Sequence, residues 1–312
     1  MEPAVPLPGT QDLLFEAARS LRRCEQALAA VFEQAGYAEV IPPAIEGAEI
    51  FGVEAFRALD KSGKLVALRS DFTAQVARIA ATRLAGVSPL RLWYRGSVVR
   101  RDREQIDERV QAGCEYVGAP GADADAEIIR LAAGSLRALG LNDARISLGS
   151  TGYFEALARA AGVSDRLAQA LHGAIDRKDL PTLRALCEKE VAKGLARDAL
   201  LILAQPPRPK EQAEDLLARA RSVAPGDDAL AALQRLTDVL VRCRDVEGLE
   251  VDLGEVRGLG YYTGVVFNLY AAGAPQPVGG GGRYDTLLGR FGDPRPAVGF
   301  SLNLDALVPL AC

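Results

Sequence analysis

Apolar positions recur every three or four residues between residues 12 and 35. The apolar positions of this stretch are Leu14, Ala18, Leu21, Leu28, Val31 and Phe32. Such spacing is typical of one face of an amphipathic helix, for which Asp12 is a candidate N-cap and Gly36 a stop. We predict further helices at about 123–139, where Gly140 follows, and in "GYFEALARAAG".

Shorter apolar runs with alternating or β-branched residues predict strands. "YAEVIPPAIE" is typical of a short strand that ends at Pro42, and "ARISLG" alternates like a strand. The other strand candidates are residues 65–68, 90–100, 110–117, 249–253, 261–270 and 297–303, with a closing helix at 304–310. Because hairpin-length gaps separate several of them, we expect an α+β fold with a mainly antiparallel sheet flanked by helices.

The pattern changes near Ser164, after which alanine and leucine recur at helical spacing as far as Cys243. The stretches "QPPRPKEQ" and "APGDD" interrupt this region, which indicates several short helices rather than a long one. We therefore predict a small helical insertion domain at 166–245, between a first part of the core at 1–165 and a second part at 246–312.

The composition is ordinary for a globular chain, since 49% of the 312 residues are apolar and 25% are charged. A net charge of −4 without a basic block argues against an extended nucleic-acid surface, so we do not expect tRNA as a partner. The five cysteines form no CxxC pair, which favours reduced thiols in a cytosol. No signal peptide is evident, and no apolar run approaches the roughly 18 residues of a membrane span. We expect a cytoplasmic protein.

Several familiar chemistries are excluded by what the sequence lacks. With the single histidine His172, most histidine-based catalysis and metal clusters are excluded, so no metal site is expected. "KSGKLV" lacks the first glycine and the Ser/Thr of a P-loop. "GLGYYTG" approaches GxGxxG, but we expect a strand after it rather than the helix whose N-terminus would hold a pyrophosphate. The sequence therefore predicts no cofactor.

Five segments place polar residues in apolar surroundings that we interpret as strand-like. They are "LRSDFTAQVAR" (68–78), "LWYRGSVVRRDR" (92–103), "VQAGCEYVG" (110–118), "VRGLGYYTGVVF" (256–267) and "VGGGGRYD" (278–285). Residues two apart in a strand share a face, so Gly113 would leave room between Gln111 and Glu115. Together the segments supply carboxylates, an amide, phenols and arginines over glycines, which suits a small zwitterion. A set of structural salt bridges is the alternative.

These segments resemble the signatures of histidyl-tRNA synthetase, a class II aminoacyl-tRNA synthetase. "RGLGYYTGVVF" is similar to the family's R-G-L-D-Y-Y-x-x-T-V-F, and "GGGGRYD" is similar to its second signature. "LRSDFTAQVAR" resembles L-R-P-E-x-T-x-x-x-A-R, and "AGYAEVIPPAIE" resembles motif 1. The resemblance runs from "LPGTQDLL" to "AVGFSLNLDAL" and implies a class II synthetase-like fold and a homodimer.

The resemblance also implies a histidine pocket, carried over one residue at a time. Asp71 stands where the family has the Glu that meets the α-amino group, and Thr73 matches beside it. Gln111 and Glu115 match the pair in Q-x-G-x-E, and Arg100 matches the motif 2 arginine.

Three further pocket residues come from the histidine signature. Arg257 matches the arginine that reaches the substrate carboxylate. Tyr261 and Tyr262 match the tyrosines that form walls around the imidazole. Without the resemblance, the two tyrosines could simply pack a strand, and the glycines could simply allow close approach at a sheet bend.

The residues expected to hold ATP depart from the family pattern. Motif 3 ends G-F-x-x-G-x-E-R-L in the family, but here Asn303, Asp305 and Ala306 replace its glycine, glutamate and arginine. Removing one such electrostatic group typically costs about 10²–10³ in rate. Gly260 replaces the aspartate of R-G-L-D-Y-Y, and we expect a shortened motif 2 loop at 104–110. Because the sequence ends directly after motif 3, we expect no anticodon-binding domain.

A kept amino-acid pocket with a depleted ATP site resembles the synthetase-like regulatory subunits of ATP phosphoribosyltransferase, the first enzyme of histidine biosynthesis. That resemblance implies a non-catalytic subunit that assembles with a short-form catalytic subunit, as a hetero-octamer of four plus four. It also implies histidine as the feedback effector. The sequence leaves two places open for it, this pocket or a subunit interface, and the pocket can also be the relic of one that held a substrate. The alternatives are a stand-alone ligase that forms histidyl-adenylate and an RNA-binding module.

Overall fold

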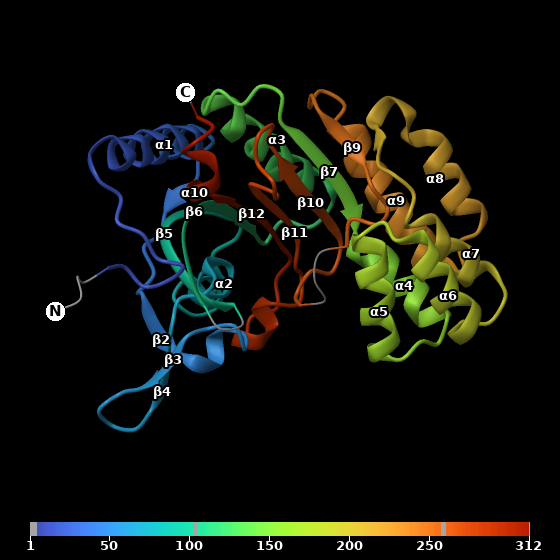
Figure 1. Ribbon diagram of the computed structural model, residues 1–312, viewed down its shortest axis with the longest axis horizontal. Coiled ribbons are helices and arrows are strands. Elements are labelled where there is room, and N and C mark those ends of the chain that lie inside the picture. The colour runs from blue at the N-terminus through green and yellow to red at the C-terminus, as the bar shows by residue number, and fades with distance from the viewer. Residues whose placement is uncertain (1–4, 103–104, 257–259, 312) are drawn as a thin grey trace. The chain divides into compact units, whose positions relative to one another are not determined.

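The computed structural model describes residues 5–102, 105–256 and 260–311. The chain divides into two compact units, each assembled from segments that are distant in sequence (Figure 1). Unit 1 extends to Ala119 and also contains Gly134–Asn142 and the residues from Thr286 onward. Unit 2 consists of Pro120–Ala133 and Asp143–Asp285.

A long β-hairpin is the centre of unit 1. Its arms are β5 (Leu90–Asp102) and β6 (Gln105–Val117), which pair antiparallel along their whole length. β12 (Ala297–Asn303) pairs antiparallel with β6, and the short β1 (Ala38–Glu39) pairs parallel with β5. Polar side chains at alternate positions of β6 are therefore brought to one face of the hairpin.

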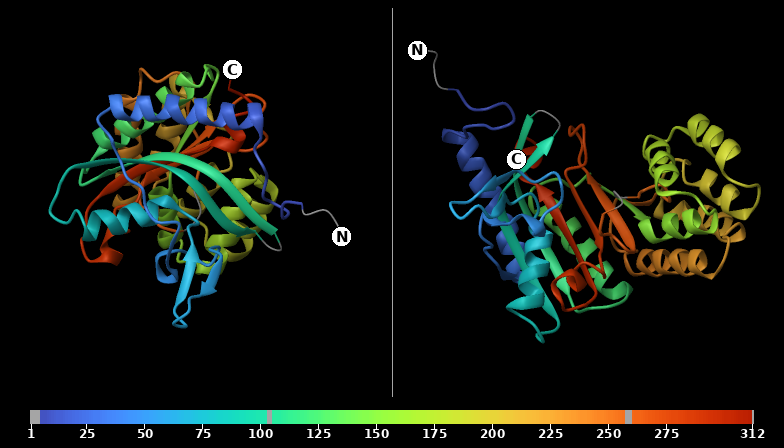
Figure 2. Two further views of the ribbon diagram at one scale, coloured as in Figure 1. Left: turned by 90° about the vertical axis from the view of Figure 1, so that its left-hand side faces the viewer. Right: turned by 90° about the horizontal axis from the view of Figure 1, so that it is seen from below.

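Two helices cover opposite faces of this hairpin (Figure 2, left). Phe32 of the first helix contacts the ring of Trp93, with centroids 5.8 Å apart, whereas Phe72 of the second stacks on Tyr94. Because Trp93 and Tyr94 are neighbours in β5, they point to opposite faces. The helices are α1 (Phe15–Gln34) and α2 (Phe72–Thr82).

A second, small sheet of unit 1 lies between β1 and α2 in the sequence. It has the strand order β2-β4-β3, with both pairs antiparallel. Its apolar side chains Ile45, Leu59 and Leu65 are exposed, which is unusual for large apolar residues of a strand. The strands are β2 (Ile45–Gly47), β3 (Arg57–Leu59) and β4 (Leu65–Leu68), and the short α10 (Leu304–Leu307) follows β12.

Unit 2 has its own run of strands, in the order β11-β10-β7-β9-β8. β10 pairs antiparallel with β11 on one side and β7 on the other, and β7 pairs parallel with β9. The bounds are β7 (Arg145–Ser150), β8 (Arg208–Pro209), β9 (Leu249–Val251), β10 (Val265–Tyr270) and β11 (Gly279–Arg283).

Most of the remaining chain of unit 2 is helical, and several helices begin at side-chain caps. Ser150, Ser164 and Asp179 each accept a backbone N–H of the first turn that follows. The helices are α3 (Ala122–Ala138, of which the part up to Ala133 belongs to this unit), α4 (Thr151–Ala160), α5 (Asp165–Asp176), α6 (Leu180–Glu190), α7 (Leu195–Ile202), α8 (Ala213–Ser222) and α9 (Asp227–Arg242). The insertion domain at 166–245 stays a prediction, because unit 2 also contains sheet strands.

The predicted mainly antiparallel sheet with flanking helices is confirmed, but local details differ. The first helix has Leu14 as N-cap, without a side-chain cap, rather than Asp12. Residues 72–82 are helical rather than strand-like, because Asp71 caps the first turn of α2. The predicted strand at 261–270 begins only at Val265, and the expected loop at 104–110 is largely part of β6.

Candidate functional site

Five of the eight residues predicted for a histidine pocket lie in unit 1, and they gather at the start of α2 and on the hairpin. They are Asp71, Thr73, Arg100, Gln111 and Glu115. Tyr261 and Tyr262 lie in unit 2, and Arg257 lies outside the described residues. The two groups are therefore described separately.

The contact between Thr73 and Glu115 is the centre of the group in unit 1. The Thr73 hydroxyl donates to Oε1 of Glu115 at 2.7 Å, which joins the first turn of α2 to β6. The same Oε1 accepts the hydroxyl of Tyr94 at 3.3 Å. Glu115 is only 1% exposed, so its carboxylate is held by hydrogen bonds in place of water. A buried carboxylate of this kind favours a ligand group that carries N–H donors.

Asp71 is fixed by the helix that it begins. Its Oδ1 accepts the backbone N–H of Ala74 at 3.1 Å, so one oxygen serves as the N-cap of α2. The resemblance assigned Asp71 to the α-amino group of histidine, and the structure adds a local structural role. The predicted ligand contact itself stays a prediction.

Arg100 and Gln111 lie on the two arms of the hairpin. Arg100 donates from Nε to the carbonyl oxygen of Ser70 at 2.8 Å, directly beside Asp71. Gln111 is buried, and it lies opposite Gly96 of β5 and Asn303 of β12. It shares the β6 face of Glu115, as the alternation of the sequence predicted.

The tyrosine segment of unit 2 is fixed on the glycine strand β11. The rings of Tyr261 and Tyr262 lie 4.8 Å apart, and Tyr284 meets Tyr261 edge-on at 5.7 Å. A Cβ on Gly282 would lie 2.7 Å from the carbonyl oxygen of Val265 and 3.0 Å from Cδ1 of Tyr262, so glycine allows both the β10 backbone and the ring to lie close to β11. Thr263 donates its backbone N–H to the Arg283 carbonyl at 2.8 Å. The three tyrosine rings thus form an aromatic cluster that is held against strand β11.

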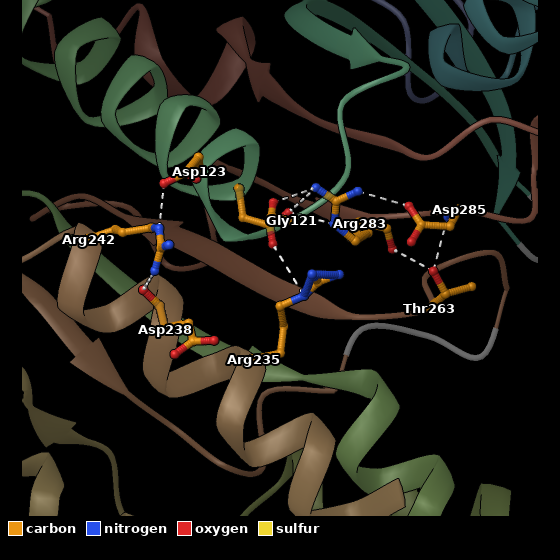
Figure 3. A network of polar contacts seen from close by, with 9 residues as sticks. Gly121, Asp123, Arg235, Asp238, Arg242, Thr263, Arg283 and Asp285 are labelled. Carbon is orange, nitrogen blue, oxygen red and sulfur yellow. Dashed lines mark hydrogen bonds and ion pairs between the residues drawn. The ribbon is translucent and has the colours of Figure 1, made fainter.

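Arg283 fixes the end of β11 through a buried ion pair (Figure 3). Its Nε donates to Oδ1 of Asp125 at 2.7 Å, and both side chains are 1% exposed. Nη1 donates to Asp285 at 2.9 Å, and the Asp285 N–H donates to Oγ1 of Thr263 at 3.0 Å. Burial raises the pKa of the Asp125 carboxyl, and the Arg283 charge opposes that rise. This network supports the segment that carries the tyrosines.

Two of the motif 3 residues form hydrogen bonds within the chain. The Asn303 side chain accepts the Asp305 N–H at 3.2 Å and caps α10. Asp305 accepts Nε2 of Gln11 at 2.9 Å and the backbone N–H of Val110 at 2.6 Å, so both of its oxygens are used. Ala306 supplies no charge where the synthetase pattern has an arginine. This stretch therefore presents none of the positive charge that an adenylating site needs around its phosphates.

The profile of the histidyl-tRNA synthetase family matches residues 9–307. A protein of Geobacter sulfurreducens named ATP phosphoribosyltransferase regulatory subunit is 37% identical, over 97% of this chain and 72% of the relative. Its namesake in Symbiobacterium thermophilum is 39% identical, over 96% of this chain and 78% of the relative. The chain belongs to the histidyl-tRNA synthetase family, among its ATP phosphoribosyltransferase regulatory subunits.

Solved structures of this family confirm the predicted class II synthetase-like fold. One from Bacillus halodurans, titled ATP phosphoribosyltransferase regulatory subunit/histidyl-tRNA synthetase, superposes with a TM-score of 0.90 and 27% identity. The superposition covers 100% of this chain and 84% of the Bacillus halodurans chain. A histidine--tRNA ligase subunit from Alicyclobacillus acidocaldarius reaches a TM-score of 0.84 with 30% identity, over 99% of this chain and 97% of the other.

Sequence reasoning missed several residues that build the site. Tyr94 lies opposite Gly113 in the hairpin, so the glycine makes room for the phenol as well as for its neighbours in β6. Tyr284 completes the aromatic cluster, and Asp125 pairs with Arg283 from a distant segment. An aromatic residue opposite a glycine is a usable signal only once the register of the hairpin is known.

Among the residues that the structure describes, no three His, Cys, Asp or Glu side chains gather as a metal site would require. A membrane-crossing helix, long and apolar enough for a bilayer, is likewise absent from this part of the chain.

Proposed function

We propose that this chain acts as a non-catalytic regulatory subunit of ATP phosphoribosyltransferase and takes part in the first step of histidine biosynthesis. The observation that carries the proposal is the identity of 37% over 97% of the chain with a regulatory subunit. The replacement of the motif 3 arginine by Ala306 supports it, because amino-acid activation develops negative charge on phosphates that this position no longer meets.

The proposal includes histidine as the effector. The buried Glu115, with its donors Thr73 and Tyr94, supplies a fixed carboxylate for an imidazole N–H, and Gln111 lies on the same face. In unit 2, Tyr261 and Tyr262 supply aromatic walls of the kind that imidazole packs against. Regulation then follows from binding one state of the complex more tightly than another. A coupling of about 1–3 kcal/mol between the two subunits would change the affinity of the partner for its ligand about 5- to 150-fold.

The proposed partners are a short-form catalytic subunit and a second copy of this chain, in a hetero-octamer of four plus four. The motif 1 segment, from which the resemblance implies a dimer, exposes Ile41 by 83% and Ile45 by 56%. Apolar residues with such exposure are typical of a surface that another chain covers. A cytoplasmic location agrees with Cys24, Cys114, Cys187 and Cys243 being free thiols.

The test is reconstitution with the short-form catalytic subunit from the same source. We expect a complex by light scattering, higher phosphoribosyltransferase activity than the catalytic subunit has alone, and inhibition by histidine. Glu115→Gln should weaken the inhibition while assembly persists, and the exposed Glu247→Gln is the matched control that should inhibit normally. If the two chains do not associate, the proposal is wrong.

A stand-alone histidine-activating ligase is the second candidate. The 30% identity with a histidine--tRNA ligase subunit favours it, as does the retained Arg100. Histidine-dependent ATP–pyrophosphate exchange above background by the purified chain would support the ligase and count against a purely regulatory role.

A further inference from the structure

Three side chains of unit 1 stack into a column that ends at Glu115. The guanidinium carbon of Arg69 lies 4.0 Å from the centroid of the Phe72 ring. Phe72 stacks on Tyr94, with centroids 4.4 Å apart and planes only 10° from parallel. The Tyr94 hydroxyl donates to Oε1 of Glu115 at 3.3 Å. The column therefore connects a charged side chain outside the predicted pocket to the carboxylate within it.

The far end of the column is held by backbone. Arg69 donates from Nε to the carbonyl oxygen of Ser97 at 2.9 Å and from Nη1 to that of Pro42 at 3.2 Å. These acceptors fix the plane of the guanidinium, because its donors have a rigid geometry. Phe72 in turn belongs to the first turn of α2, which Asp71 caps. Both rings of the column, Phe72 and Tyr94, are only 1% exposed.

Two glycines of the hairpin provide the space for the column. Gly96 has φ +145°, and a Cβ there would lie 3.1 Å from Nη2 of Arg69 and 3.2 Å from Cζ of Phe72. A Cβ on Gly113 would lie 2.2 Å from the carbonyl oxygen of Phe300 and 2.6 Å from the Tyr94 hydroxyl oxygen. Both glycines therefore leave room for the stack, and Gly113 also allows the close approach of the β12 backbone.

The Tyr94 phenol is a permanent donor in this place. Burial and the nearby Glu115 charge raise the pKa of Tyr94 well above its ordinary value, so the phenol keeps its proton across the neutral range. An ionised carboxylate only accepts hydrogen bonds. Its Oε1 thus receives two hydroxyls, one from Thr73 and one from Tyr94.

We propose that Tyr94 is a positioning residue of the histidine pocket, whose hydroxyl, held by the stack of Arg69 and Phe72, fixes the Glu115 carboxylate for the imidazole. This inference rests on the proposed histidine pocket. Thr73 from α2 and Tyr94 from β5 donate to the same oxygen, so two donors from different elements restrict the orientation of the carboxylate. Orientation of this kind sets affinity because the ligand then does not have to order the side chain on binding.

The main variant is Tyr94→Phe, which keeps the ring and its stacking but removes the donor. A hydrogen bond to a charged group is worth enough that we expect histidine to bind about tenfold or more weakly. Phe72→Leu, which removes the stack and leaves the hydroxyl, should weaken binding in the same direction by a smaller factor. It also serves as the second variant if Tyr94→Phe does not fold. The matched control is Tyr153→Phe, a fully buried tyrosine of unit 2, which should bind histidine normally.

The measurement is a double-mutant cycle on the complex with the catalytic subunit, using histidine in calorimetry. For variants that bind histidine too weakly for calorimetry, inhibition of the phosphoribosyltransferase activity at millimolar histidine measures the affinity. If Tyr94 acts through Glu115, the loss of histidine affinity caused by Tyr94→Phe should be smaller in a Glu115→Asp background. The shorter aspartate side chain already moves the carboxylate away from the Tyr94 hydroxyl. A merely structural role would give the same loss in both backgrounds and would overturn the inference.

Failure of this inference can be told apart from failure of the proposed function. If the wild-type complex binds histidine and Tyr94→Phe binds it equally well, only the positioning role is wrong. If the wild-type complex shows no saturable histidine binding, the pocket and the positioning role are both wrong.

Discussion

The carboxylate of Glu115 lies in the space that a side chain at Gly299 would occupy. A Cβ built on Gly299 would be 1.6 Å from Oε2 of Glu115 and 2.6 Å from the carbonyl oxygen of Cys114. Gly299 faces Glu115 directly across the β12–β6 pair. The orientation of the predicted ligand-binding carboxylate therefore depends on a missing side chain in the neighbouring strand.

Gly299→Ala should weaken histidine binding by more than tenfold, because the carboxylate must turn away and the backbone beside it cannot yield. We also expect the free energy of unfolding to fall by about 1–3 kcal/mol, as is usual for overpacking. Calorimetry with histidine and urea unfolding measure the two effects. The matched control is Gly134→Ala in α3, where the nearest atom to a new Cβ is 3.9 Å away. That variant should be neutral or slightly stabilising.

Asp125→Ala should destabilise the protein strongly, since it leaves the buried Arg283 without its main partner. Breaking a buried pair in this way typically costs about 3–5 kcal/mol. The control is Asp228→Ala, whose partner Arg159 is exposed, and which should cost less than about 1 kcal/mol. Chemical denaturation of both variants decides the matter, and equal losses would contradict the buried-pair account.

Asp305→Ala should release the segment before α1, because the Asp305 carboxylate joins Gln11 to the N–H of Val110. We expect faster hydrogen exchange around Gln11 and a loss of about 1–3 kcal/mol in the free energy of unfolding. Asp305→Asn retains one acceptor oxygen. Its hydrogen exchange around Gln11 and its free energy of unfolding should lie between those of the wild type and Asp305→Ala. Unchanged exchange in Asp305→Ala would show that other contacts hold the segment.

Alkaline pH should destabilise the fold through its buried thiols. Burial raises the pKa of Cys243 to about 11 and raises those of Cys24, Cys114 and Cys187. A thiol with a raised pKa stays protonated in the folded chain while the unfolded chain loses its proton. The free energy of unfolding should therefore fall as pH rises from about 9 toward 11, by up to about 1.4 kcal/mol per pH unit for each thiol.

Urea unfolding between pH 7.5 and 10.5 tests the alkaline prediction, in a Cys312→Ser background that removes the terminal thiol. Cys243→Ala should give a shallower decline with pH than its parent. A free energy of unfolding that stays level over this range would contradict the burial-driven shift.

Ile41→Glu should weaken the proposed homodimer, because it places a charge on an exposed apolar position of the motif 1 segment. Light scattering across a dilution series should show more monomer than for the wild type. Val241→Glu is the control, since Val241 is also exposed, by 57%, but lies in α9 of unit 2. If both variants dimerise like the wild type, the motif 1 surface is not the interface.

The sequence predicted the periodic elements well, because their signals are local. The strand at 65–68 was predicted to the residue, and the helix before Gly140 differs by one residue at each end. The helix at 72–82 was missed because residues 68–78 were interpreted as strand-like surroundings of polar residues. Its capping residue Asp71 was noticed only as a candidate ligand, although an aspartate before such a run is also a helix-start signal.

The candidate site was predictable only as far as family signatures and strand alternation extend. Gln111 and Glu115 share a face as alternation requires, and Thr73 reaches Glu115 from another element. Tyr94, Asp125 and Gly299 could not be assigned, because their roles depend on strand register and on contacts across long sequence separations. A one-residue change of register would have removed each of those contacts.

The engagement of Asp305 limits what a single substitution at the motif 3 position can restore. Its two oxygens accept hydrogen bonds from Gln11 and from the backbone N–H of Val110, so they are occupied by contacts within the chain. Ala306→Arg would add one charge and leave these contacts in place. Asn303 and Asp305 would still differ from the synthetase pattern, so an engineered return to ATP binding needs several substitutions at once and not one.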